Sequence, residues 1–176
     1  KILLGEIRDH ETAEMAVRIA LTGHALFSTL HTEDTVSAVF RMIEMGVPPY
    51  LLAATISGVI AQRLVRRVCP YCSETYTAAE DVPEIAQGTP YERGTMLVRG
   101  CGCERCHGSG YRGRMAIHEV LPMTPRLRAT VLQAHDKETL RAAAEADGME
   151  TLWQDGVAKA VAGETTLEEV GRVLYG

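Results

Sequence analysis

Two short apolar runs near the start of the chain flank a segment with helical periodicity. Residues 2–4 form the first run and residues 25–30 the second, while residues 10–22 carry a helical pattern that ends at Gly23. A strand, a helix and a strand of these lengths predict a βαβ unit, in which the two strands are parallel and buried. Because the chain opens directly inside the first strand, we expect it to be a later part of a longer protein.

Polar and charged side chains follow both predicted strands. Glu6, Arg8 and Asp9 come after the first strand, and His31 and Thr32 come after the second. In open parallel sheets, ligands bind outside the carboxyl ends of the strands. A carboxylate there can hold Mg²⁺ through its water shell, and a histidine can donate to a phosphate oxygen. The pattern therefore predicts one ligand site built from these five side chains.

The two histidines near the second strand are not equivalent. His24 precedes the strand and His31 follows it. Seven residues of extended chain span about 23 Å, so the two side chains lie at opposite ends and cannot share a phosphate. We expect His24 to serve packing or a subunit interface.

The rest of the pattern predicts two more helices, then short strands, then a helical region. Two helices are expected first, from residue 34 or 35 to 45 and over 50–65. A largely irregular segment over 73–94 follows, with short strands at 96–98 and 115–117. Four late helices are expected from 124, over 137–146, over 151–161 and from 166. Thr166 and Glu169 have the spacing of a capping box. These patterns divide the chain into an α/β region (1–66), a cysteine region (67–121) and a helical region (122–176).

Composition narrows the class of protein. The chain has 176 residues, of which 46% are hydrophobic, enough for one core or a core with an appendage. Its formal net charge of −5 argues against a nucleic-acid binder. The longest apolar stretch, 51–65, is shorter than the ~20 residues of a membrane span and is interrupted by polar residues. No signal peptide is visible, and we expect no membrane insertion.

The cysteines are spaced for metal binding. Four of the five form two Cys-x-x-Cys pairs, which are Cys69/Cys72 and Cys103/Cys106. Two such turns supply the four thiolates of a structural zinc site, and the intervening loop costs little because closure entropy grows slowly with length. The alternative is four reduced thiols. Cys101 could compete as a ligand and His107 could substitute for one.

The glycines at 108, 110 and 113 match the Gly-x-Gly-x-x-Gly dinucleotide fingerprint. That fingerprint requires a strand before it and a helix after it. Here a cysteine turn precedes the motif and a strand follows, so the glycines are expected to form tight turns around the metal. Arg112 and Arg114 are interpreted as solvated or ion-paired, with phosphate contact as the alternative.

Several ordered motifs resemble those of one family. Residues 5–13 look like the Walker B box of the secretion ATPases, and residues 22–32 look like their His box. The resemblance to the secretion ATPases is made more specific by residues 61–67, by the tetracysteine pattern and by residues 110–114. The chain resembles the C-terminal part of the assembly ATPases of type II secretion and type IV pili. The tetracysteine insert separates it from the pilus-retraction ATPases.

This resemblance implies the C-terminal half of a RecA-like P-loop NTPase domain, followed by a zinc-binding and a helical subdomain. It implies a homo-hexamer that hydrolyses ATP with Mg²⁺, lies in the cytoplasm at the inner membrane and works on an inner-membrane platform protein. Glu6 would be the Walker B acid and His31 the γ-phosphate contact. The Walker A lysine, a catalytic acid and arginine fingers would lie upstream. This chain has no Gly-x-x-x-x-Gly-Lys-[Ser/Thr] segment, so we expect it to be inactive alone.

Two other classes of function stay open at this point. The first is a zinc-ribbon nucleic-acid module, whose basic residues would be Arg63, Arg66, Arg67, Arg112 and Arg114. The acidic net charge and the lack of interleaved aromatic residues oppose it. The second is a non-catalytic interaction module. The sequence does not separate secretion from pilus assembly, nor does it assign a role to Cys101.

Overall fold

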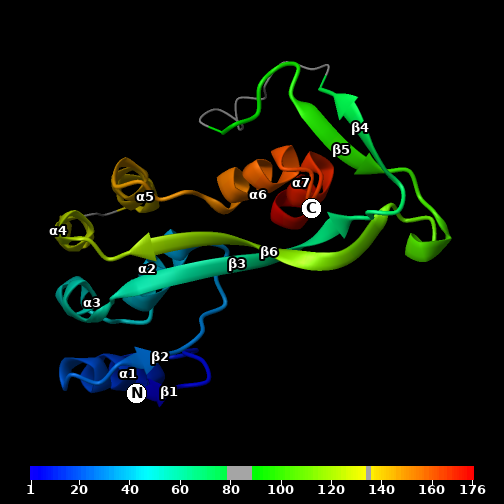
Figure 1. Ribbon diagram of the computed structural model, residues 1–176. Coiled ribbons are helices and arrows are strands. Elements are labelled where there is room, and N and C mark those ends of the chain that lie inside the picture. Colours follow the sequence, from blue (N-terminus) through cyan, green and yellow to red (C-terminus); the bar gives the residue numbers. More distant parts are fainter. Residues whose placement is uncertain (79–88, 134–135) are drawn as a thin grey trace. The chain divides into compact units, whose positions relative to one another are not determined.

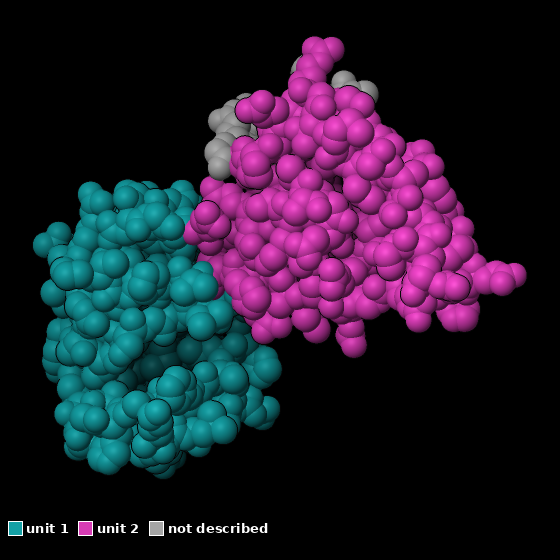
Figure 2. Space-filling model, in the orientation of Figure 1, with its two compact units in different colours: residues 1–61, 120–149 teal, residues 62–119, 150–176 magenta. Residues whose placement is uncertain are grey.

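The computed structural model describes residues 1–78, 89–133 and 136–176. They form two compact units, and each unit combines two stretches of chain (Figure 2). Unit 1 comprises residues 1–61 and 120–149, and unit 2 comprises residues 62–119 and 150–176. The chain passes between the units three times, once after residue 149 and twice along strands. These strands are β3 (Gly58–Val68) and β6 (Tyr111–Pro122), which pair with each other in a two-stranded sheet (Figure 1).

The start of unit 1 is the predicted βαβ arrangement. Strand β1 (Ile2–Leu3) is followed by helix α1 (His10–Leu21) and strand β2 (Leu26–Phe27). The two strands are parallel, with Ile2 opposite Leu26 and Leu3 opposite Phe27. The predicted topology and the predicted helix are therefore confirmed.

The expectation that these strands are buried is wrong, because one face is exposed and the other is only half-buried. Leu3 and Phe27 are 80% and 61% exposed, whereas Leu26 packs against the core of unit 1. Successive side chains of a strand point to opposite faces, so burying one face of the pair leaves the other open.

Helices supply most of the core of unit 1. Besides α1 they are α2 (Thr35–Glu44), α3 (Pro49–Thr55), α4 (Pro125–Gln133) and α5 (Lys137–Ala146). Three of the five begin at an aspartate whose side chain accepts a backbone N–H of the first turn, at Asp9, Asp34 and Asp136. The largest fully buried side chains of this core come from several of these helices, and one comes from β6; they include Val36, Val39, Leu52, Leu127 and Leu140 on the helices and Leu121 on the strand. None of the helices in the described ranges is both long and apolar enough to cross a membrane.

The predicted helix over 50–65 is correct only as far as Thr55. Ile56 is already extended, with φ −69° and ψ 125°, and strand β3 begins at Gly58. Buried or half-buried positions alternate with exposed ones from Gly58 to Val65, which is the period of a strand. A Cβ on Gly58 would lie 3.2 Å from the carbonyl oxygen of Leu121 on β6. Pairing with β6 therefore overrides the helical propensity of this segment.

Unit 2 contains an antiparallel hairpin that the sequence analysis assigned partly to loop. Strand β4 (Ser73–Thr77) pairs with β5 (Met96–Gly100), with Ser73 opposite Gly100 and Thr77 opposite Met96. The predicted irregular segment 73–94 is therefore wrong for its first five residues. Residues 79–88 lie outside the described residues.

Two helices and one turn of 3₁₀ helix complete unit 2. They are α6 (Leu152–Val161), α7 (Leu167–Tyr175) and η2 (Glu104–Cys106). Helices α6 and α7 pack closely at Gly156. A Cβ added to this residue would lie only 2.5 Å from Cγ1 of Val170. Leu97 of β5 and Val157 of α6 belong to one buried cluster, which joins the hairpin to the helices.

A buried carboxylate fixes α7 to β3. The side chain of Glu169 is fully buried and accepts from Arg66 Nη2 at 2.6 Å and from Arg172 Nε at 2.7 Å. Thr166 caps α7 by accepting from the backbone N–H of Glu169 at 3.2 Å. The predicted cap is therefore confirmed, but the Glu169 carboxylate turns to the two arginines and does not complete a capping box.

The two compact units do not coincide with the three regions predicted along the sequence. Helices α4 and α5 belong to unit 1, whereas α6 and α7 belong to unit 2. The regions 1–66, 67–121 and 122–176 thus describe motifs along the chain, while each compact unit draws on an early and a late stretch.

Candidate nucleotide-binding edge and metal centre

The segments that follow β1 and β2 bring three of the predicted side chains together. Glu6 Oε1 lies 2.6 Å from Arg8 Nη2, and Glu6 Oε2 lies 3.1 Å from His31 Nε2. Parallel pairing continues past the strand ends, where the N–H of Ile7 donates to the carbonyl of Thr29 at 2.9 Å. The two segments therefore deliver Glu6 and His31 to the same edge, as the sequence predicted. We call Glu6, Arg8 and His31 the strand-tip cluster.

The strand-tip cluster holds an anionic carboxylate that solvent can reach. Hydrogen bonding from Arg8 is the main cause that lowers the pKa of Glu6 below its ordinary value, and His31 lowers it further. The Glu6 side chain is 33% exposed and that of His31 is 82% exposed. A charged carboxylate beside a guanidinium and an imidazole suits a hydrated divalent cation and an anionic ligand.

The other predicted residues of this edge make local contacts. Asp9 caps α1 by accepting from the N–H of Thr12 at 2.9 Å, and this bond lowers the pKa of Asp9. The Thr32 hydroxyl donates to the carbonyl of Asp34 at 3.3 Å. His24 lies at the opposite end of β2 from His31, with its Nδ1 2.9 Å from the Thr22 hydroxyl.

The four paired cysteines converge in unit 2. The ligand atoms of Cys69, Cys72, Cys103 and Cys106 all lie within 4.8 Å of one another. The Cys69–Cys103 and Cys72–Cys106 sulfur pairs are each 3.9 Å apart, and the Cys103–Cys106 pair is 3.7 Å apart. Zinc–sulfur bonds of about 2.3 Å in a tetrahedron place the sulfurs about 3.8 Å apart. The donor set and its spacing therefore fit a tetrahedral metal ion.

Backbone groups prepare this cluster for thiolates. The N–H groups of Cys103 and Gly110 donate to the sulfur of Cys106 at 3.1 and 3.3 Å. The backbone bond from Cys103 is the main cause that lowers the pKa of the Cys106 thiol to about 6. Burial, together with the neighbouring sulfurs, raises the pKa of Cys72 to about 12. Four thiolates so close together need a cation to coexist.

The glycine motif serves the turns around the sulfurs, as predicted. Gly108, Gly110 and Gly113 all have positive φ, at +76°, +75° and +81°. A Cβ on Gly100 would lie only 2.0 Å from the carbonyl oxygen of Gly110, so the backbone of β5 crosses this turn in contact. Strand β6 begins at Tyr111, inside the motif, and runs on past Gly113, whereas a dinucleotide fingerprint requires a helix there.

Cys101 does not belong to the four-sulfur cluster in the structure. The cluster also receives a backbone hydrogen bond that was not predicted from the sequence. Among the described residues the metal-ligand group contains neither Cys101 nor His107. A hydrogen bond to Glu74 is the main cause that raises the pKa of the Cys101 thiol. The N–H donor at Gly110 was not predicted, because backbone donors leave no signature beyond the glycine itself.

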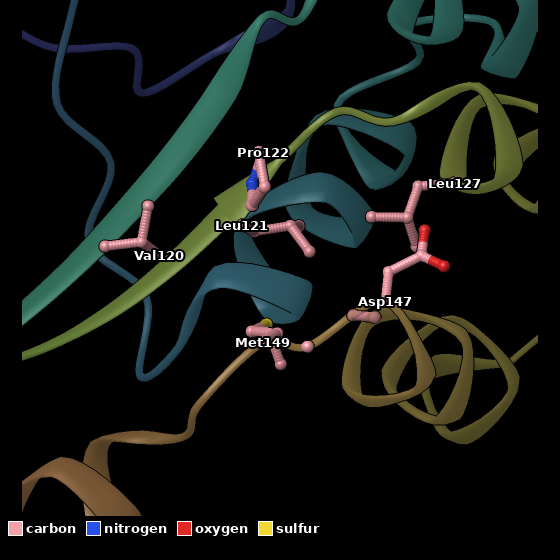
Figure 3. Close-up of a pocket in the computed structure, with 8 residues that line it drawn as sticks. Val120, Leu121, Pro122, Leu127, Asp147 and Met149 are labelled. Atoms are coloured by element: carbon pink, nitrogen blue, oxygen red, sulfur yellow. The ribbon is translucent and has the colours of Figure 1, made fainter.

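A pocket of about 250 Å³ in unit 1 is distinct from both sites (Figure 3). Its lining is mainly apolar and includes Leu121, Leu127 and Met149. Its one carboxylate, on Asp147, accepts from the Thr124 hydroxyl at 2.6 Å and from Arg126 at 3.1 Å. A phosphate site needs several hydrogen-bond donors, whereas this lining is mainly apolar and carries a carboxylate that already has its own partners. The pocket therefore does not resemble a phosphate site.

Sequence comparison places the chain in a family. Residues 1–172 match the type II/IV secretion system protein family. The chain is 46% identical over 172 residues to type II secretion system protein E of Dickeya dadantii, covering 98% of this chain and 34% of that protein. It is 45% identical over 170 residues to the type IV pilus assembly ATPase PilB of Thermus thermophilus, covering 96% of this chain and 19% of that protein.

Structural comparison gives the same fold. The pilus retraction motor PilT, solved with bound ADP, matches with a TM-score of 0.64 at 22% identity, covering 97% of this chain and 38% of PilT. The ATPase DotB of Legionella pneumophila matches with a TM-score of 0.62 at 20% identity, over 97% of this chain and 37% of DotB. The chain thus spans between about a fifth and two fifths of the length of these relatives. On the match over residues 1–172 and these sequence identities, the chain belongs to the type II/IV secretion system protein family.

Proposed function

We propose that this chain is the C-terminal half of a RecA-like ATPase domain with its zinc-binding and helical subdomains. The full-length protein would hydrolyse ATP to power type II secretion or type IV pilus assembly. The observation that carries the proposal is the strand-tip cluster, in which Glu6 lies within hydrogen-bonding distance of Arg8 and His31 at the carboxyl edge of a parallel strand pair. Relatives described as assembly ATPases, and PilT with bound ADP, support it.

Each residue of the cluster has a role that follows from its chemistry. Glu6, as an anion, would hold the water shell of Mg²⁺, which supplies positive charge against the phosphate oxygens. His31 would donate from its imidazole N–H to a γ-phosphate oxygen. Arg8 keeps Glu6 ionised and leaves guanidinium N–H groups for phosphate oxygens. Phosphoryl transfer relies mainly on such positioning and electrostatics. Asp9 and Thr32 would border the nucleotide from α1 and from the segment after β2.

The metal centre would hold structural zinc on Cys69, Cys72, Cys103 and Cys106. Four thiolates in a closed shell leave no open position for substrate, which is the pattern of a structural zinc site. The ion would fix the two turns at the end of β3 and the start of β6, and its binding energy would add to the folding energy of unit 2.

The wider setting follows from the family. We propose a homo-hexamer that lies in the cytoplasm at the inner membrane and transmits the work of ATP hydrolysis to an inner-membrane platform protein. The relatives are described both as type II secretion and as type IV pilus proteins, so both processes are included in the proposal.

Replacing Glu6 by glutamine in the full-length protein tests the ATPase proposal. We expect Glu6→Gln to retain ATP binding and to lose most ATP turnover, by about a hundredfold or more, because the charge that organises the cation is removed. Glu14→Gln, exposed on α1 and outside the Walker B-like residues 5–13, is the matched control and should keep parental turnover. Parental turnover in Glu6→Gln would show that Glu6 only ends a strand.

The 176-residue chain alone should show no ATP turnover above background. It has no P-loop segment, whose backbone N–H groups and lysine hold the β- and γ-phosphates. A phosphate-release assay checks this, and turnover that Glu6→Gln abolishes would contradict the half-site assignment.

A further inference from the structure

The two metal-binding turns carry an arrangement of side chains that the proposed ATPase function does not use. Tyr71 lies between the two cysteines of the first turn and is 55% exposed. The Cζ atom of Arg105, from the second turn, lies 4.1 Å from the centroid of the Tyr71 ring, and that of Arg112, from the start of β6, lies 5.3 Å from it. We call these three residues the tyrosine–arginine patch.

The patch is assembled by the fold and not by proximity in sequence. Tyr71 and the two arginines are 34 and 41 positions apart, and the convergence of the four sulfurs brings their turns together at one end of β3 and β6 (Figure 1). A guanidinium that stacks on an aromatic ring keeps its in-plane N–H groups free to donate. The ring therefore orders two guanidinium groups without neutralising their charge.

The charges of the patch have no carboxylate partner among the described residues. Exposed arginines elsewhere in the chain, such as Arg18, Arg41 and Arg99, pair with a glutamate at 2.6–3.3 Å. Arg105 and Arg112 form no ion pair in the described parts of the chain, and each lies against the Tyr71 ring. Glu104 is the one acidic residue within the two turns (69–72 and 101–113), and it lies next to Arg105 in the sequence.

We propose that the tyrosine–arginine patch binds a short acidic segment of a partner protein in an extended conformation. Both guanidinium carbons lie within 5.3 Å of one ring centroid. Carboxylates at positions i and i+2 of an extended peptide lie on one face about 6.6 Å apart, which suits two guanidinium groups held this closely. The patch offers too few basic residues for a membrane surface, which favours clusters of 4–8. The net charge of −5 opposes a nucleic acid.

Fluorescence anisotropy on the full-length protein tests the proposal. The probe is a labelled peptide in which Glu and Ser alternate, and the control peptide replaces Glu by Gln. We expect the acidic peptide to bind and the neutral one not to. Arg105→Glu with Arg112→Glu should weaken binding by about tenfold or more, because two charge-assisted contacts become repulsive. Glu104→Gln should strengthen binding by removing a competing charge.

Matched controls separate this effect from net charge and folding. Arg18→Glu with Arg41→Glu changes the charge equally on unit 1 and should leave peptide binding unchanged. Unchanged metal content and melting temperature should show that the patch variant is folded, and Arg105→Gln with Arg112→Gln repeats the test if it is not. The proposal is overturned if the acidic peptide does not bind, or if it binds the folded patch variant as tightly as the parent. It is also overturned if phosphatidylglycerol vesicles or RNA need these arginines while the peptide does not.

Discussion

The metal centre and the strand-tip cluster both arise where two chain segments converge, yet they differ in completeness. At the metal centre four sulfurs lie within 4.8 Å, two of the four cysteines are buried, and backbone N–H groups point at a ligand atom. At the strand tips two exposed side chains, those of Arg8 and His31, contact the half-exposed carboxylate of Glu6. The metal centre therefore offers the four donors that a tetrahedral metal ion requires. The strand-tip cluster supplies one acid, one guanidinium and one imidazole, and these three side chains alone do not form a cradle for phosphates.

This difference suits the metal centre to a structural role, whereas the strand-tip cluster is suited to be one part of a site that other groups complete. A closed thiolate shell acts locally, by holding two turns together. An exposed carboxylate with an arginine and a histidine acts only when a ligand and further groups meet it. Changes at the metal centre should therefore act on folding, and changes at the strand tips should act on nucleotide chemistry while the fold is kept.

The largest effect is expected from breaking the metal shell. Cys72→Ser should lose the ion and unfold the cysteine region of unit 2 while the helices of unit 1 stay folded. Structural zinc in small domains contributes about 10 kcal/mol or more of apparent binding free energy, so no other contact of the turns can replace it. Metal analysis should give about one zinc per parental chain and none in the variant.

Cys101→Ser is the matched control for that experiment, because Cys101 lies outside the group of four. It should keep the metal and the melting temperature of the parent. If the parent contains no metal and chelation leaves its melting unchanged, the four cysteines are reduced thiols.

A smaller effect is expected at the buried carboxylate of α7. Burial tends to raise the pKa of Glu169, but bonds from Arg172 and Arg66 outweigh it and lower the value to about 2. Since the unfolded value is about 4.3, the carboxylate contributes about 3 kcal/mol above pH 4.3, and this is lost as pH falls toward 2. Glu169→Gln should therefore lower the free energy of unfolding by about 3 kcal/mol at neutral pH, measured by urea denaturation.

The pH dependence distinguishes this charge from simple packing. The difference between parent and Glu169→Gln should shrink between pH 4.3 and 2. Glu168→Gln, on the exposed face of the same first turn, should change stability by only a few tenths of a kcal/mol. A difference that stays constant over this pH range would mean that the carboxylate charge is not what stabilises α7.

Local signals in the sequence predicted most helix limits correctly. Helix α5 covers the predicted residues 137–146, because an aspartate cap precedes it and Gly148, at φ +89°, follows its last turn. Strand β3 was not predictable in the same way. Its apolar, alanine-containing segment has no breaker apart from Gly58, and only pairing with β6, about fifty residues later, selects the extended form.

The two sites also differed in how much of each could be predicted from local sequence signals. The Cys-x-x-Cys spacing by itself predicts a four-sulfur cluster, and the structure contains it. The strand-tip residues could be placed at one edge by βαβ topology, which correctly joined Glu6 with Arg8 and His31. It could not show that Asp9 and Thr32 have local backbone partners, because helix caps and short turns compete for the same polar side chains.

The phosphate assignment of the strand-tip cluster is tested by replacing the two histidines that flank β2, His24 and His31, separately in the full-length protein. ATP and ADP affinities are the quantity to measure. His31→Ala should weaken ATP relative to ADP by roughly 1.5–3 kcal/mol, about ten- to a hundredfold, because a hydrogen bond to a charged γ-phosphate is lost. His24→Ala, at the opposite end of the strand, should leave the ratio unchanged. If His24→Ala removes the preference for ATP and His31→Ala keeps it, the nucleotide lies at the other end of β2, and Glu6 is not part of its site.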